Sequence, residues 1–123
     1  MFSFNYNLFK WVSGRQTSGY FKMLLATSNF PIPFDLYFLK FPEGSFIKEH
    51  IDPVKSGYKH FRLNIILKKS KIGGEFISEK HIFESSRIKF FRPDIYKHSV
   101  TKIEKGNRYV LSFGFLIKDK KKL

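Results

Sequence analysis

Residues 35–53 read DLYFLKFPEGSFIKEHIDP and contain two strand-like runs joined by a turn. Asp35–Phe41 and Phe46–Asp52 are runs of the length and period-two pattern typical of β-strands. Pro42-Glu43-Gly44 separates the two runs, and Pro53 closes the second. The stretch therefore predicts two successive strands joined by a tight turn.

The same pattern continues on both sides of this stretch. Further strands are expected at Tyr20–Leu25, Phe61–Lys68, Glu75–Ser78, Arg87–Phe91, Lys97–Thr101 and Arg108–Ile117. Turns are expected at Lys69–Gly74, Pro93-Asp94 and Lys105-Gly106-Asn107. Short pieces of helical periodicity occur in the first 30 residues, where one helix is allowed for. Many short strands separated by turns predict a mainly β sandwich or barrel-like jelly roll with a short N-terminal extension.

Length and composition indicate a single ordered domain and exclude several kinds of chemistry. The 123 residues suit one domain, 1–123, in which residues 118–123 are expected to form a flexible basic tail. With 42% hydrophobic and 19% aromatic residues, disorder is excluded as the default state. Because the chain has no Cys, thiolate chemistry and zinc fingers are excluded, and any metal must be held by His, Asp or Glu. With neither a signal peptide nor a membrane-spanning run in the sequence, a cytoplasmic protein without a membrane partner is expected.

The charge is strongly positive, with 23 Lys and Arg against 10 Asp and Glu and a net charge of +13. Such a balance suggests a polyanionic partner such as nucleic acid. However, 18 of the basic residues are Lys, and the residues with A- and T-rich codons are in excess throughout. We interpret the charge mainly as codon bias, and nucleic acid stays open as a partner.

A His-x-Asp pair lies within the second run of the opening stretch. An extended strand would place His50 and Asp52 on one face and Ile47 on the other. An imidazole and a carboxylate so placed can take two neighbouring positions on a metal ion, and His98 is the best candidate for a third. Two His and one carboxylate suit non-haem Fe(II).

A second candidate group lies in the last expected strand. There, Arg108, Val110 and Ser112 share one face. The flanking residues 109–116 are too apolar for an exposed strand, so Arg108 is expected to point into a pocket. A buried guanidinium beside a hydroxyl can bind a carboxylate.

These motifs together resemble the Fe(II)- and 2-oxoglutarate-dependent dioxygenase superfamily, above all its prolyl-hydroxylase-like branch with short bacterial and viral members. The resemblance covers roughly residues 20–117 and implies a mainly β fold, a cupin-like double-stranded β-helix or jelly roll. It rests on the order and spacing of the motifs His50-Ile51-Asp52, Gly73-Gly74-Glu75-Phe76, His98-Ser99-Val100 and Gly106-Asn107-Arg108, with Asp35–Gly44 as the lead-in strand and turn.

The resemblance implies a role for each matched residue. His50, Asp52 and His98 would be the iron ligands, and Arg108 would pair with the distal carboxylate of 2-oxoglutarate, helped by Ser112. Asn64 shares a face with Arg62 and Ile66 and is the candidate for a further cosubstrate contact, with a purely structural role as the alternative. Several relatives place a Tyr on this strand, and this chain does not.

The implied cofactors are Fe(II), 2-oxoglutarate and dioxygen, and the implied reaction is hydroxylation of a C–H bond coupled to decarboxylation of 2-oxoglutarate to succinate. A protein or peptide side chain is the favoured substrate, because the chain is close to a minimal jelly roll. Oxidation or demethylation of a nucleic-acid base by the same chemistry is the second interpretation. A non-catalytic cupin-like binding module and a basic β-barrel nucleic-acid binder are the non-enzymatic alternatives. Oligomeric state is not predicted.

The other histidines, the single Trp and the paired glycines are expected to have structural roles. His60 and His81 are expected at the surface, away from the metal. Trp11 is expected to pack against the sheet, with lining of the substrate mouth as the alternative. Gly73 and Gly74 are expected to form a turn with no catalytic role.

Overall fold

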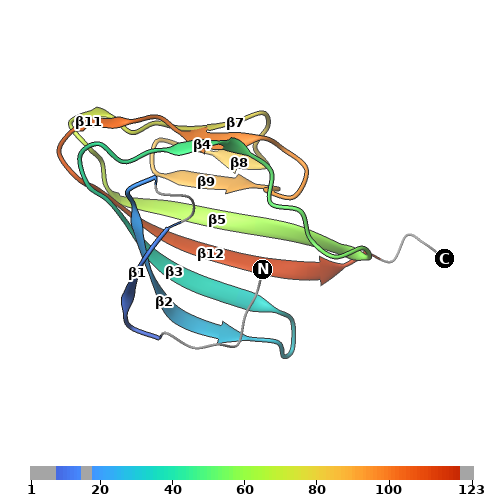
Figure 1. The fold of residues 1–123 in the computed structure, drawn as a ribbon. Helices are drawn as coiled ribbons and strands as arrows, with labels where there is room; N and C mark the ends of the chain where they lie inside the picture. Colours follow the sequence, from blue (N-terminus) through green and yellow to red (C-terminus); the bar gives the residue numbers. More distant parts are fainter. Residues whose placement is uncertain (1–7, 15–17, 120–123) are drawn as a thin grey trace.

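A computed structural model describes residues 8–14 and 18–119 of the chain. These residues form antiparallel strands and no helix (Figure 1). In chain order the strands are β1 (Trp11–Ser13), β2 (Phe21–Ser28), β3 (Phe34–Phe41), β4 (Ile47–His50), β5 (Tyr58–Lys68), β6 (Ile72–Gly73), β7 (Phe76–Ser78), β8 (Phe83–Glu84), β9 (Ile88–Phe91), β10 (His98–Val100), β11 (Ile103–Lys105) and β12 (Arg108–Lys118).

The strands form one large sheet and two small ones. The large sheet has seven strands in the order β1-β2-β3-β12-β5-β9-β8, so its two longest strands, β5 and β12, lie side by side near the centre. The small sheets have the orders β4-β10-β7 and β11-β6 and lie over one face of the large sheet (Figure 1). This is a cupin-like jelly roll, which confirms the expected fold class.

All eight expected strands are present, with ends that differ by at most three residues. The structure adds four short strands, β1, β6, β8 and β11, of two or three residues each. The expectation of an N-terminal helix is wrong for the described residues, where β1 and β2 pair with each other instead. Residues 1–7 and 15–17, on which that expectation also fell, lie outside the described residues.

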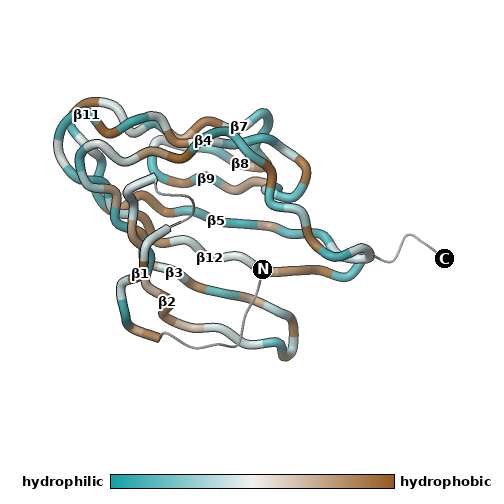
Figure 2. Tube along the Cα trace, viewed as in Figure 1, coloured by the Kyte–Doolittle hydropathy of each residue, from teal (hydrophilic) through white to brown (hydrophobic). Residues whose placement is uncertain are grey.

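The core fills the space between the sheets at one end of the jelly roll. Phe41, Val110 and Ile103 are at most 1% exposed, and the ring of Tyr20 stacks on that of Phe41 with centroids 5.0 Å apart. The hydrophobic residues that build this core come from all three sheets rather than from one segment. Figure 2 shows hydrophobic positions spread over many strands in the same way. The core thus closes one end and leaves the space between the sheets open further along.

The C-terminal expectation needs a correction. Lys118 still pairs with Tyr58 at the end of β12, and the Asp119 N–H donates to the Gly57 carbonyl over 2.7 Å. Lys118 therefore belongs to the sheet and Asp119 is bonded to the chain just before β5, so neither forms part of a flexible tail; residues 120–123 lie outside the described residues. In the described part of the chain, no helix could cross a membrane.

Candidate metal centre

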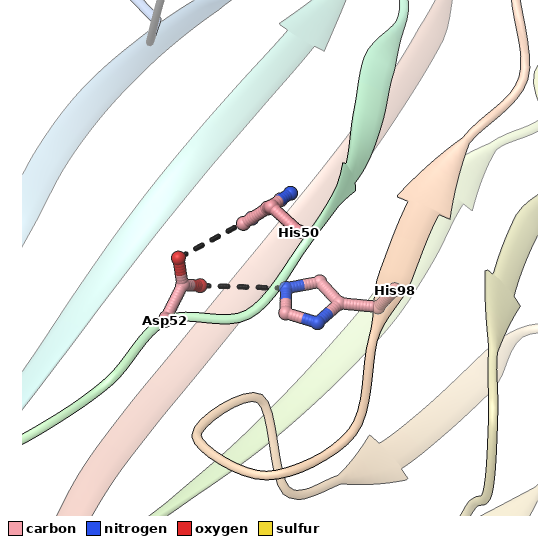
Figure 3. Close-up of side chains that lie close together, drawn as sticks. All are labelled: His50, Asp52 and His98. Carbon is pink, nitrogen blue, oxygen red and sulfur yellow. Dashed lines mark ion pairs between the residues drawn. The ribbon is translucent and has the colours of Figure 1, made fainter.

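His50, Asp52 and His98 lie close together (Figure 3). They come from β4, from the segment that follows β4, and from β10 of the three-stranded sheet. His50 ends β4, His98 begins β10, and the two residues are register partners. Asp52 follows β4, where its N–H donates to the Pro93 carbonyl over 2.8 Å. The Asp52 carboxylate reaches His50 Nε2 over 3.2 Å and His98 Nε2 over 3.3 Å.

A β-bulge in β4 changes which of its side chains face inward. Between the pairs Val100–Ile47 and His98–His50, β4 spans one residue more than β10. The extra residue breaks the alternation, so Ile47 and His50 both face the cavity while Lys48 and Glu49 are exposed. The expectation that Ile47 and His50 lie on opposite faces is therefore wrong.

The backbone fixes the orientation of both imidazoles. His50 Nδ1 lies 2.7 Å from the Lys48 carbonyl, and His98 Nδ1 lies 2.9 Å from the Tyr96 carbonyl. A carbonyl oxygen only accepts, so each Nδ1 carries the proton and each Nε2 faces Asp52. Anchoring one ring nitrogen to a carbonyl is the arrangement that orients metal-ligating His in proteins.

The donor set fits a divalent metal ion. Two ligand atoms at right angles around an ion, with bonds near 2.1 Å, lie about 3 Å apart, close to the two distances observed here. Burial works to raise the pKa of Asp52, but its contacts with the His50 and His98 rings lower the pKa well below its ordinary value. The site therefore holds a carboxylate and two oriented imidazoles ready for an ion.

The triad lines a cavity of about 440 Å³ between the sheets, and Arg108 faces the same cavity. Arg108 is 4% exposed, and its guanidinium lies over the ring of Phe41 at 5.4 Å. No described residue forms a hydrogen bond or an ion pair with this guanidinium. Burial lowers the pKa of Arg108 to about 10, which leaves it charged at neutral pH. The expectation that Arg108 points into a pocket is confirmed.

Two other expected residues also line the cavity. Ser112 is 2% exposed, and its Oγ accepts a 2.8 Å hydrogen bond from Arg62. Since that oxygen accepts from Arg62, the Ser112 hydroxyl proton is left for another acceptor. The buried Oδ1 of Asn64 has no hydrogen-bond partner among the described residues. Both side chains thus offer polar atoms to a bound molecule.

Sequence reasoning passed over Asp35 and the role of Arg62. The Arg62 guanidinium donates to Asp35 Oδ1 over 2.7 Å as well as to Ser112, so all three side chains form one network on the large sheet. Gly114 leaves the space for that guanidinium, because a Cβ there would lie 2.0 Å from Arg62 Nη2. The sequence did hold a sign of this network, because Asp35 and Arg62 are charged residues at inward positions of otherwise apolar strands.

The other histidines and Trp11 lie outside the triad. His60 was expected at the surface but is only 5% exposed, and its Nε2 lies 3.3 Å from Arg62. His81 is also largely covered, and its Nδ1 lies 3.4 Å from Glu84. Trp11 packs on Phe38, with ring centroids 5.4 Å apart, and does not line the cavity.

The paired glycines were expected in a turn, but Gly73 ends β6, where it pairs with Ile103, and Gly74 lies between β6 and β7. Gly73 and Gly74 have φ of 77° and 73°, a conformation that favours glycine. A Cβ on Gly73 would lie 2.1 Å from the Lys102 carbonyl oxygen. Their role is to let β6 approach β11 closely.

Comparison with known proteins supports the fold. The chain is similar to one from the crystal structure of Rhodobacter sphaeroides SigE in complex with the anti-sigma ChrR, with 18% sequence identity and a TM-score of 0.52. The match covers 86% of this chain and 48% of that chain, so this chain spans about half of its length. No family model and no curated protein matches the chain. At this identity the likeness bears on the cupin-like fold alone.

Proposed function

We propose that this protein is an Fe(II)- and 2-oxoglutarate-dependent dioxygenase that hydroxylates a C–H bond. One observation carries the proposal: a buried, unpaired Arg108 faces the same cavity as a His-Asp-His metal triad. Burying a guanidinium that no hydrogen bond or ion pair neutralises is costly, and the exposed Glu75 acts on Arg108 only from beyond ion-pair distance, so the cavity is suited to an anionic ligand. A dicarboxylate that engages both a metal ion and Arg108 fits this combination.

Different residues of the cavity would bind the metal ion and the cosubstrate. His50, Asp52 and His98 would hold the ion and leave further coordination positions open. The distal carboxylate of 2-oxoglutarate would accept hydrogen bonds from the Arg108 guanidinium and the Ser112 hydroxyl. Bound Fe(II), 2-oxoglutarate and dioxygen would supply the oxidising chemistry, coupled to release of succinate. Apolar neighbours such as Phe91 and Val110 would keep water out of the cavity.

A protein or peptide side chain is the substrate class we favour. The cavity of about 440 Å³ exceeds what a five-carbon diacid fills, so an extended side chain can enter beside it. Base oxidation in a nucleic acid would need contacts that read a flipped base. No Arg in the described chain is left for that purpose, since each is paired, bonded to backbone or buried in the cavity.

The test is metal and cosubstrate binding followed by turnover. We expect the protein to bind Fe(II) and 2-oxoglutarate together and to form succinate slowly without a prime substrate. His50→Ala and Asp52→Ala should lose metal binding and turnover while the circular dichroism spectrum persists. His81→Ala, outside the cavity, is the matched control and should keep both activities. Metal binding that survives both triad substitutions would refute the ligand assignment.

A non-catalytic cupin-like binding module is the second candidate. The observation that favours it is the similar chain from a complex of a sigma factor with an anti-sigma protein. Such a module would bind the ion and an anion and form no succinate. Binding of Fe(II) and 2-oxoglutarate without succinate, at several Fe(II) concentrations and with ascorbate present, would favour this candidate over the enzyme.

A further inference from the structure

The large sheet has a second apolar face, directed away from the cavity. On the central strand β12, the inward residues Val110 and Ser112 are at most 2% exposed. The outward residues Leu111 and Phe113 are only half-buried, although both are of the apolar kind that is typical of a protein core. A strand that is apolar on both faces is typical of a sheet covered on both sides. In the described part of the chain, the small sheets cover only the face of the large sheet that lines the cavity (Figure 1).

The outward residues of the strands on either side continue this face across the sheet. Phe38 pairs with Leu111, Leu63 with Phe113, and Phe61 with Phe115. The rings of Phe61 and Phe115 stack with centroids 5.5 Å apart. We call this surface, defined by Phe38, Leu111, Phe113, Phe115, Phe61 and Leu63, the outer face.

Exposure at the two edges of the sheet agrees with an uncovered face. Trp11, whose ring packs on Phe38, is 42% exposed at the β1 edge. Phe83, which pairs with Phe90, is 55% exposed at the β8 edge. The small sheets lie on the opposite side, where residues of β4, β7 and β10 line the cavity.

The size of the outer face matches what a stable dimer needs. The outer face continues from Phe38 onto its partner Met23 in β2. The four long strands β2, β3, β12 and β5, about 4.8 Å apart and with about four outward positions each about 6.8 Å apart, give roughly 500 Å² in projection. A standard interface buries about 800 Å² of accessible surface per partner, and rough side-chain surface exceeds its projection. An apolar patch of this extent on a soluble protein marks an interaction site.

The charges favour a second copy of this chain as the occupant. Despite a net charge of +13, the centre of the face carries no charged side chain, and Lys40 and Lys59 lie at its two ends. Two copies can therefore meet face to face without bringing like charges into the apolar centre. We propose that the protein forms a symmetric homodimer through the outer face, with the two large sheets packed against each other. Both cavities then open away from the interface, so the dimer is independent of the proposed function.

Sedimentation equilibrium of the full-length protein over a wide concentration range tests this proposal. We expect twice the mass of the chain at high concentration. Leu111→Glu places a charge at the centre of the face and should raise the dissociation constant roughly 30-fold or more. Ile77→Glu is the matched control, because Ile77 is an apolar residue of β7 that is 51% exposed and lies off this face. A wild-type monomer at every concentration would overturn the proposal, as would a dimer that only Ile77→Glu dissociates.

A second readout needs no variant. Trp11 is the single Trp of the chain and lies at the edge of the outer face. Dimerisation should protect it, so acrylamide quenching of its fluorescence should rise as the protein is diluted. Quenching that stays the same across the dissociation range would contradict an interface at this face.

Discussion

Two arginines line one cavity, Arg108 buried and Arg62 half-buried, and they differ in their partners. Arg62 is bonded to Asp35 and Ser112, whereas Arg108 lies over the ring of Phe41 and has no hydrogen bond or ion pair with any residue that the structure describes. A buried pair that loses one partner is strongly destabilised, because the other charge is left alone. A buried charge that has no partner already bears that cost in the ligand-free protein. The two residues should therefore respond in opposite directions to the same substitution.

We expect Arg108→Met to stabilise the ligand-free protein by about 1–2 kcal/mol, because it removes an unpaired buried charge. The same change should weaken 2-oxoglutarate binding more than tenfold. Arg62→Met, the control, should destabilise the protein by about 3 kcal/mol, since it strands the Asp35 carboxylate. Urea denaturation and calorimetric titration measure the two effects. Equal destabilisation by both substitutions would show that Arg108 has a structural partner.

His60 makes stability depend on pH. Burial and the nearby Arg62 cation lower the pKa of His60 from its ordinary 6.5 to about 4. The unfolded chain therefore binds a proton on this residue more readily than the folded protein does. The contribution is fully present above pH 6.5 and is lost as the pH falls from 6.5 towards 4, with an upper size of about 3 kcal/mol.

We expect His60→Gln to remove this part of the pH dependence. The free energy of unfolding of the wild type should fall between pH 6.5 and 4.5, and that of the variant should fall less steeply. The comparison is made above pH 4.5 to limit the contribution from carboxylates such as Asp94, whose pKa is lowered by Arg92. Parallel pH profiles for the two proteins would contradict a neutral, buried His60.

At the scale of the elements, β5 and β12 hold the polar network in place. Arg62 on β5 pairs across to Gly114 on β12, and Gly114 is small enough for the guanidinium to lie over it. We expect Gly114→Ala to destabilise the protein by about 1–3 kcal/mol, because the new methyl group would displace the guanidinium.

A double-mutant cycle with Arg62→Met identifies the cause. In that background the methyl group meets no guanidinium, so Gly114→Ala should cost clearly less than in the wild type. Denaturation of the four proteins gives the coupling free energy. A cost that is the same in both backgrounds would place the effect in the strand backbone instead.

The sequence predicted the strands well because their patterning is local, and it predicted the site only in part. Arg108 and Ser112 face inward as expected, since β12 is long and regular. Ile47 does not follow its expected face, because a bulge depends on the register with β10 and leaves no local signal. The sequence did not predict the short strands β6 and β8 for the same reason. Each is a strand because it pairs with another part of the chain, and its own two residues show no pattern. The burial of His60 likewise depends on the strands that surround it.

At the scale of the whole molecule, the positive charge is carried by lysine. Of five Arg, the structure describes four, and each has a role within the fold. Arg92 forms a two-point ion pair with Asp94, and Arg87 donates to the carbonyls of Ile66 and Leu67. Arg62 belongs to the polar network, and Arg108 faces the cavity. The described surface therefore offers a polyanion flexible ammonium groups and no free arginine fork for reading guanine.

From this distribution we expect weak DNA binding that depends on salt and not on sequence. If six Lys contact phosphates, affinity should fall about 10³-fold between about 50 and 200 mM salt. Fluorescence anisotropy with one G·C-rich and one A·T-rich duplex of equal length measures both properties, and the two duplexes should bind alike at every salt concentration. A dimer that pairs the outer faces leaves these lysines exposed, so the same salt dependence is expected for Leu111→Glu. Binding that persists at high salt, or that prefers one duplex, would mean that the charge serves a nucleic-acid partner and is more than a consequence of codon usage.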